Sequence, residues 1–139
     1  MSTQHQLINP ETMAPAKGFA HAVVPSDGRA VYLAGQTASD ITGAIVGDTF
    51  DQQYDLALWN VVEALKAAGG EPTDIVSLVV YTTTMSEYRN GLHEVGAAHR
   101  KHLGKHFPAM AMLGVTELFD PAATVEIIAT AVIPATIRP

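Results

Sequence analysis

Residues 75–81 read IVSLVVY, and this nearly continuous run of β-branched and apolar side chains decides the fold. Such a run is typical of a strand covered on both faces, since a half-exposed strand would alternate. Helical patterns flank it: one covers residues 49–68 and stops at Gly69-Gly70, and a second begins at Ser86 and ends near Gly104. Strands that alternate with helices predict a mixed α/β (α+β) domain.

Two further pairs of strands are predicted near the ends of the chain. Residues 19–24 and 30–34 flank Pro25-Ser26-Asp27-Gly28, which has turn chemistry, so these strands are predicted to form a hairpin. Residues 109–115 and 124–132 form the last two strands. The predicted order is β-β-α-β-α-β-β, and the polar residues before the first strand are expected to be peripheral.

Composition excludes several classes of protein. The 139 residues suit a single domain over 1–139, and 47% hydrophobic with 16% charged residues excludes a disordered chain. A net charge of −6 with eight Lys and Arg argues against nucleic acid or an anionic membrane as partner, because phosphate binding needs clustered cations. The absence of cysteine excludes disulfides, thiolate catalysis and Cys-based metal centres.

Targeting and cofactor motifs are also missing from the sequence. The N-terminus, MSTQHQLINPE, lacks the basic and apolar regions of a signal peptide, and no run approaches the ~20 apolar residues of a membrane helix. A cytoplasmic location is therefore expected. With no GxGxxG, P-loop or GxSxG pattern, neither a nucleotide cofactor nor a serine nucleophile is expected.

The predicted sheet has too few helices to cover both of its faces. Two helices can cover one face, and the other still carries apolar side chains from residues 75–81, 109–115 and 124–132. A large exposed apolar patch is rare on a soluble monomer. We therefore expect self-association, with another copy of the chain as the cover.

A series of short motifs runs in order along nearly the whole chain. It comprises Ala14-Pro15, Phe19, Ala34-Gly35-Gln36, Asn60, Ala67-Ala68-Gly69, Asp74-Ile75-Val76, Pro108-Ala109 and Val125-Glu126-Ile127. In this series the chain resembles the RidA/YjgF family. The resemblance implies a chorismate-mutase-like fold and a homotrimer, in which the sheets form a central barrel and small-molecule clefts lie between subunits. It also implies hydrolysis of reactive enamines and imines to keto acids and ammonia.

Several polar positions of the family are apolar in this chain. Met110 stands after Pro-Ala, where the family has an arginine that binds the substrate carboxylate through two parallel hydrogen bonds. Ala34 replaces a serine, Phe19 a tyrosine and Leu92 an asparagine, and Glu126 alone of this polar set is present. A buried carboxylate without a charged partner is costly, so the ordinary RidA substrate is not expected.

Glu126 is the candidate catalytic residue, as a general base or water-orienting acid, a role that the resemblance also implies. The alternative is a strand residue that faces solvent or pairs with a Lys or Arg of a neighbouring subunit. The candidate substrate-binding residues are Phe19, Ala34, Gly35, Leu92, Ala109, Met110 and Met112. Their alternative is ordinary core or interface packing, for which Met is a common filler.

The histidines carry weaker signals. Four of them suggest a metal site by their clustering: His93, His99, His102 and His106. No metal is expected, because Gly104 should break the helix within this cluster and no Cys is available, and the alternative is a polar helix end. His21 is either an acid or base in the cleft or a residue hydrogen-bonded in place.

Two functions are compatible with these residues. The first is an enzyme that hydrolyses a small imine, enamine or related amide, whose substrate is neutral or holds its carboxylate elsewhere. The second is a non-catalytic module that binds an apolar metabolite or a protein. Ribonuclease activity is disfavoured by the acidic charge and the sparse Lys and Arg.

Overall fold

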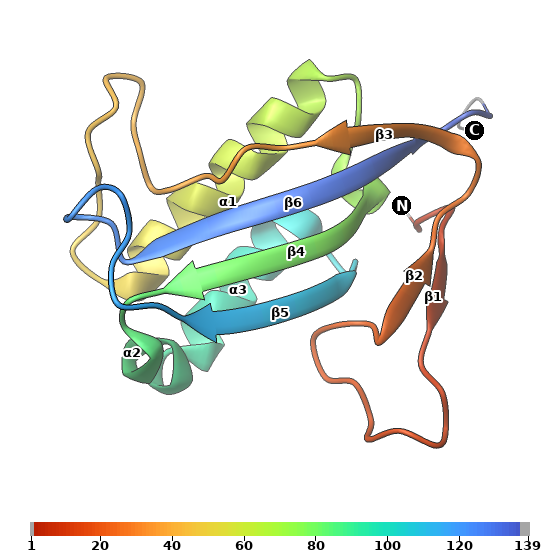
Figure 1. Cartoon of the computed structure of the whole chain (residues 1–139), viewed down its shortest axis with the longest axis horizontal. Helices are drawn as coiled ribbons and strands as arrows, with labels where there is room; N and C mark the ends of the chain where they lie inside the picture. The colour runs from red at the N-terminus through yellow and green to blue at the C-terminus, as the bar shows by residue number, and fades with distance from the viewer. Residues whose placement is uncertain (1, 137–139) are drawn as a thin grey trace.

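The computed structural model describes residues 2–136, which form a four-stranded sheet, a two-stranded sheet and helices on one side (Figure 1). The elements are β1 Gln6–Ile8, β2 Ala22–Val24, β3 Gly28–Tyr32, α1 Phe50–Ala67, the 3-10 turn η1 Pro72–Asp74, β4 Ile75–Thr82, α2 Met85–Asn90, α3 Leu92–Leu103, β5 Ala109–Gly114 and β6 Val125–Pro134. Apart from β1 and a break in the second helix, this is the predicted β-β-α-β-α-β-β order, so the mixed α/β class is confirmed. The domain predicted over 1–139 also includes residues 1 and 137–139, which lie outside the described residues.

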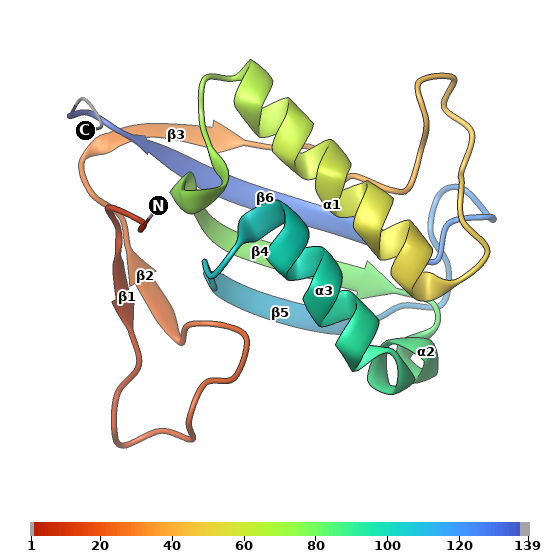
Figure 2. The same ribbon diagram turned by 180° about the vertical axis from the view of Figure 1, so that it is seen from behind.

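The main sheet has the strand order β3-β6-β4-β5. Strand β6 pairs antiparallel with both β3 and β4, while β4 and β5 are parallel. A parallel pair needs a long crossover, and here the chain between β4 and β5 forms α2 and α3. Figure 2 shows α1 and α3 side by side across the same face of this sheet. The helices therefore cover one face, as predicted.

The hydrophobic core lies between these helices and the sheet. Side chains that recur at helical spacing along α1, among them Leu58, Val61 and Leu65, are fully buried there. On β6, Val125 and Ile127 are both 0% exposed. Because side chains alternate along a strand, the β6 residues between them point to the opposite face. The apolar stripe predicted for the first helix is thus confirmed.

The opposite face of the main sheet, called the open face below, carries apolar side chains into solvent. Tyr32 on β3 is 82% exposed, Leu113 on β5 43% and Ile128 on β6 36%. Val79 and Tyr81 on β4 lie between them and are half-buried. The second covering layer that the apolar pattern of β4 predicts is not formed by residues 2–136 themselves. Self-association stays a prediction.

The hairpin predicted for residues 19–24 and 30–34 is wrong. Strand β2 pairs with β1, and β3 pairs with β6 in the main sheet. An isolated two-stranded hairpin is marginal in water, whereas a place beside the ten-residue β6 gives β3 a packed partner. The turn residues Pro25 to Gly28 redirect the chain but do not decide what each strand pairs with. Strand β3 also ends at Tyr32, so Ala34 lies beyond it.

Most of residues 2–12 are exposed, as expected, but His5 is an exception. His5 is buried, and its Nε2 donates to the carbonyl oxygens of Val132 (2.9 Å) and Asp74 (3.2 Å). Its Nδ1 accepts a hydrogen bond from the Ser26 backbone N–H at 3.1 Å. One imidazole therefore ties the N-terminal segment to η1, to β6 and to the chain after β2.

The helix ends follow the sequence with two exceptions. The Thr49 side chain caps α1 by accepting a backbone hydrogen bond of 3.4 Å, and Gly104 ends α3 at a φ of 63°, which glycine adopts without strain. The second predicted helix is two helices, because Gly91 separates α2 from α3. Thr84 rather than Ser86 precedes α2. In the described part of the chain, no helix is both long and apolar enough to span a bilayer.

Candidate functional site

The predicted site residues divide into two groups on opposite faces of the main sheet. One group lines a cavity of about 400 Å³ between α3 and β5, called the helix-side cavity below: Phe19, Leu92, Met110 and Met112. The other group lies at the start of β6 and beside it: Ala34, Gly35 and Glu126. Ala109 belongs to neither group, because it borders a separate shallow depression that Phe19 also borders. Within one chain the predicted site is thus not a single pocket.

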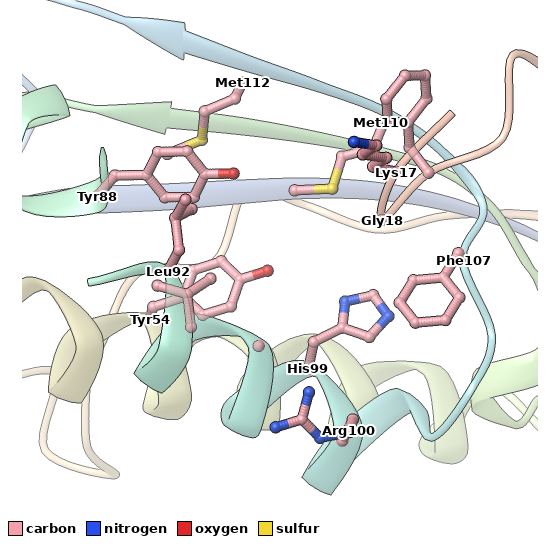
Figure 3. A pocket seen from close by; sticks show the side chains of 13 residues that line it. Lys17, Gly18, Tyr54, Tyr88, Leu92, His99, Arg100, Phe107, Met110 and Met112 are labelled. Carbon is pink, nitrogen blue, oxygen red and sulfur yellow. The ribbon is translucent and has the colours of Figure 1, made fainter. Parts of the chain in front are cut away.

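The walls of the helix-side cavity come from segments far apart in the sequence. Strand β5 supplies Met110 and Met112 (Figure 3). The segment before β2 supplies Lys17 and Phe19. Helix α3 supplies Leu92 at its first turn and further residues along its length. The lining is mostly apolar with a few polar groups, as is typical of small-molecule cavities.

Two tyrosine hydroxyl groups, from α1 and α2, point into this cavity (Figure 3). The Tyr54 ring is 1% exposed and stacks on Phe50 with ring centroids 5.9 Å apart, and Tyr88 meets the same Phe50 ring edge to face. Neither hydroxyl has a hydrogen-bond partner within residues 2–136. Burial, with a smaller contribution from Tyr88, raises the pKa of Tyr54 above its usual value of 10.0. Tyr54 therefore presents a neutral hydroxyl that can donate.

His99 brings a hydrogen-bond acceptor to the same cavity. Its ring stacks on Phe107 at a centroid distance of 4.7 Å, and its Nε2 lies 2.7 Å from the His106 carbonyl oxygen. Because a carbonyl oxygen can only accept, Nε2 carries the proton. Burial lowers the pKa of His99 below its usual 6.5 and outweighs the opposing effect of the His106 hydrogen bond. The neutral ring therefore keeps a lone pair on Nδ1.

Two cations border the cavity, although the arginine expected from the family is absent at Met110. Arg100 lies on α3, where its guanidinium runs over Gly96: a Cβ added to that glycine would lie 3.3 Å from an Arg100 nitrogen. Lys17 comes from the segment before β2. Among the residues described, neither cation has an ion-pair partner.

Sequence reasoning missed these polar groups of the helix-side cavity. Tyr54 and His99 both lie on the buried stripes of their helices, so helical spacing alone indicates core residues. The available signal was a hydroxyl and an imidazole on otherwise aliphatic stripes, since a buried Tyr or His usually needs a partner for its polar atom. Periodicity alone does not tell whether that atom faces the core or a cavity.

Glu126 lies on the open face, away from the helix-side cavity. It is half-buried on β6 and stands opposite Tyr81 of β4. Its carboxylate lies over Gly35, where a Cβ would come within 2.7 Å of Oε2. In the described part of the chain it forms no hydrogen bond or ion pair. Glu126 is thus a carboxylate on an apolar surface that is available to a ligand, a water or a partner chain.

The other histidines are held by separate contacts. His102 Nε2 lies 2.5 Å from Asp55 Oδ1, and His106 Nε2 donates to the Ile75 carbonyl oxygen at 2.7 Å. His21 Nε2 donates to the Ala14 carbonyl oxygen at 2.7 Å, which fits the prediction that it is hydrogen-bonded in place. Within residues 2–136 no three His, Asp or Glu side chains are grouped to hold a metal ion.

Comparison with known proteins identifies the family to which this chain is related. The family model described as endoribonuclease L-PSP matches residues 10–133. Similar solved structures include YyfB from Yersinia pestis, a Rid-family protein of unknown function, at 33% identity and TM-score 0.84, covering 94% of this chain and 100% of that one. Rv2704 from Mycobacterium tuberculosis, of the YjgF/YER057c/UK114 family, is 34% identical with TM-score 0.63, covering 84% and 87%. RidA from an Antarctic Psychrobacter is 26% identical with TM-score 0.66, covering 92% and 99%. No curated protein matches the chain significantly.

Proposed function

Because the chain belongs to the Rid family, whose sequence model is described as endoribonuclease L-PSP, we propose that it binds a small metabolite and hydrolyses its C=N bond. The observation that carries this proposal is the Glu126 carboxylate, which is half-buried and without a hydrogen bond or ion pair among the residues described. A carboxylate in such surroundings needs a polar partner, and a water molecule poised for attack is one.

A second copy of the chain would unite the two groups of site residues. The open face exposes Tyr32, Leu113 and Ile128 and adjoins Glu126. Covering it with another copy would remove these apolar surfaces from water and could set Glu126 of one subunit beside the helix-side cavity of the next. We propose the homotrimer that the family resemblance implies, with the ligand cleft at the subunit boundary.

The proposed reaction needs one proton acceptor and no redox cofactor. Glu126 accepts a proton from water as the water oxygen bonds to the carbon of the C=N group, and the proton passes to the nitrogen. The resulting carbinolamine then loses ammonia as its C–N bond breaks and a carbonyl forms. General-base assistance of this kind contributes about 10²- to 10⁴-fold to a rate.

The test compares Glu126→Gln with the unaltered protein on imines and enamines generated in the assay by oxidation of parent amines. The panel runs from carboxylated to neutral compounds, and released ammonia is measured above the uncatalysed rate. We expect Glu126→Gln to lose at least about 100-fold in turnover while it keeps the thermal stability and sedimentation of the parent. Full activity in this variant would exclude the mechanism.

Gly35→Ala tests in the same experiment whether the position of the Glu126 carboxylate matters. The added methyl would displace the Glu126 carboxylate, whose Oε2 it would approach to 2.7 Å, without changing the charge. We expect reduced turnover with little loss of stability, because the end of a flexible side chain can move. Activity equal to the parent would show that the position of this carboxylate does not matter.

A non-catalytic binding function is the second candidate, and one observation favours it. Phe19, Leu92 and Met110 give the helix-side cavity an apolar lining at positions where the resemblance implies polar groups. Saturable binding of panel compounds, seen as a rise in the unfolding temperature, with no ammonia released by any of them would replace the enzymatic proposal with this one.

A further inference from the structure

We infer that the helix-side cavity recognises a small hydroxycarboxylate with an apolar body, through the Tyr54 hydroxyl, the His99 imidazole and the Arg100 guanidinium. All three line the same cavity of about 400 Å³ (Figure 3). The inference rests on the proposed function only in taking this cavity as part of the ligand cleft. It involves neither Glu126 nor any chemical step.

The Tyr54 hydroxyl is a donor that the protein leaves unused. Its ring is held in the core by Phe50, yet no described residue accepts a hydrogen bond from its oxygen. Thr124 Oγ1 is the one fully enclosed side-chain polar atom without a partner in residues 2–136, so the Tyr54 oxygen must reach accessible space. That space is the cavity, into which Figure 3 shows the hydroxyl pointing. A buried donor of this kind favours a ligand with an acceptor atom.

His99 supplies the complementary acceptor. Its Nε2–H is committed to the His106 carbonyl oxygen and its ring is stacked on Phe107, so the ring cannot turn without losing both contacts. Its Nδ1 lone pair has no donor among the described side chains or backbone N–H groups. A ligand hydroxyl can satisfy both groups, because its oxygen accepts from Tyr54 and its hydrogen is donated to His99.

Arg100 adds a binding point for a carboxylate. It follows His99 on α3 and is held along the helix over Gly96, which leaves room for the guanidinium because it has no side chain. No carboxylate of residues 2–136 pairs with Arg100 or with Lys17 across the cavity. A guanidinium offers a carboxylate two parallel hydrogen bonds. The anionic end of the ligand therefore belongs at the α3 wall.

The rest of the cavity favours an apolar ligand body. Met110 and Met112 form the wall on β5, and Leu92 lies at the start of α3. Thioethers adapt to irregular shapes and pack well on aromatic rings. A ligand with an aromatic or branched aliphatic group next to its hydroxycarboxylate end would match the cavity at both ends.

The test measures binding of three probes by titration calorimetry with the full chain. The probes are 3-phenyllactate, its neutral amide 3-phenyllactamide, and 2-methoxy-3-phenylpropanoate, whose ether oxygen accepts but cannot donate. We expect 3-phenyllactate to bind most tightly, the amide to bind at least about tenfold more weakly, and the methyl ether about three- to tenfold more weakly. Absence of saturable binding by 3-phenyllactate, or equal affinity for all three probes, would overturn the inference.

Variants test the contributions of two of the three side chains, Arg100 and Tyr54. Arg100→Met should remove the preference for the acid over the amide, whereas Arg89→Met, on the exposed surface of α2 outside the cavity, should leave it unchanged. Tyr54→Phe keeps the ring in the core and should weaken the binding of 3-phenyllactate by about three- to tenfold. A preference for the acid that survives in Arg100→Met contradicts the inference.

Glu126→Gln separates this inference from the proposed function. Only turnover is compared with the parent in this variant, because the proposed assembly sets Glu126 of one subunit beside the cavity of the next, whereas probe binding is tested at Arg100. If turnover persists in Glu126→Gln while Arg100→Met loses probe binding, only the proposed mechanism fails. If turnover is lost in Glu126→Gln and Arg100→Met binds probes normally, only the recognition site fails.

Discussion

The two faces of the main sheet differ in how much of their packing one chain supplies. Ile127 and Ile128 are neighbours on β6, yet Ile127 is 0% exposed on the face that α1 covers whereas Ile128 is 36% exposed on the open face. The helix-covered face also holds a cavity with its own hydrogen-bonding groups. The open face holds Glu126 without a partner among the residues described.

This difference indicates which properties belong to the single chain and which would need an assembly. Folding of the α1–α3 layer and binding within the helix-side cavity require only contacts that are present in residues 2–136. Any chemistry at Glu126 requires a further wall on the open face. Substitutions on the two faces should therefore change different measured quantities.

The largest expected effect comes from Ile127→Ala compared with Ile128→Ala. Ile127→Ala leaves a cavity in the core and should lower the free energy of unfolding by about 2–5 kcal/mol. Ile128→Ala removes partly exposed groups and should cost the dissociated chain less than about 1 kcal/mol. Urea unfolding measures both changes, and sedimentation should show weaker self-association only for Ile128→Ala. Equal losses of stability, or unaltered association in Ile128→Ala, would contradict the contrast between the faces.

A smaller effect should appear when the pH falls. Burial lowers the pKa of His99 and of His106 below 6.5, so the unfolded chain takes up protons that the folded chain resists. The free energy of unfolding therefore has its highest value above about pH 6.5 and falls as the pH drops below it. For each histidine the loss is roughly 1.4 kcal/mol per unit by which the pKa of the folded chain lies below that of the unfolded chain. Urea unfolding at several pH values measures the slope.

Two variants test whether the buried histidines cause this dependence of the free energy of unfolding on pH. His106→Gln should reduce the dependence of unfolding on pH below 6.5, because one of the two titrating groups is gone. His93→Gln, at an exposed position of α3, should leave the dependence as it is. An unchanged slope in His106→Gln would mean that other groups bind the protons.

The smallest expected effect is that of Asp55→Asn on the outer surface of the helices. Partial burial opposes ionisation of Asp55, but hydrogen bonds from His102 and Lys101 outweigh it and lower the pKa of the carboxyl. The Lys101 pair is solvent-exposed, at 64% and 37% of the two side chains, so salt screens it. Asp55→Asn should cost less than about 1 kcal/mol at neutral pH. A loss comparable to that of Ile127→Ala would show that this surface contributes far more than its exposure suggests.

Most helices and strands follow from the sequence because their signals are local. The stripe containing Leu58 and Val61 predicts α1, and the run at residues 75–81 predicts β4 almost to the residue. The pairing of β2 and β3 was mispredicted because a turn says nothing of partners distant in the chain. Strand β1 was missed because its three side chains are exposed or half-buried and its segment is anchored by His5, whose hydrogen bonds reach carbonyl oxygens more than 60 residues away.

The candidate site could be predicted only in part, for a related reason. The ordered series of motifs predicts Met110 and Glu126 as site residues, and the structure places them on opposite faces of the sheet. Tyr54 stands on α1 whereas His99 and Arg100 are neighbours on α3, and no linear pattern marks that their polar atoms meet one cavity.

The anchor formed by His5 has a consequence for how the protein is handled. The loop that carries Lys17 and Phe19 to the cavity is followed by β2, whose strand partner is β1, and β1 is tied to the rest of the fold by His5 and by the Thr3 hydroxyl, which donates to the Thr73 carbonyl oxygen at 2.7 Å. Shortening the chain past Ile8, or crowding His5 with a bulky fusion, would disturb these ties and leave the loop held through Ala20, whose backbone N–H donates to the Pro108 carbonyl oxygen. Affinity measurements are therefore best made on a chain whose first residues are unaltered, with any purification handle placed at the other end.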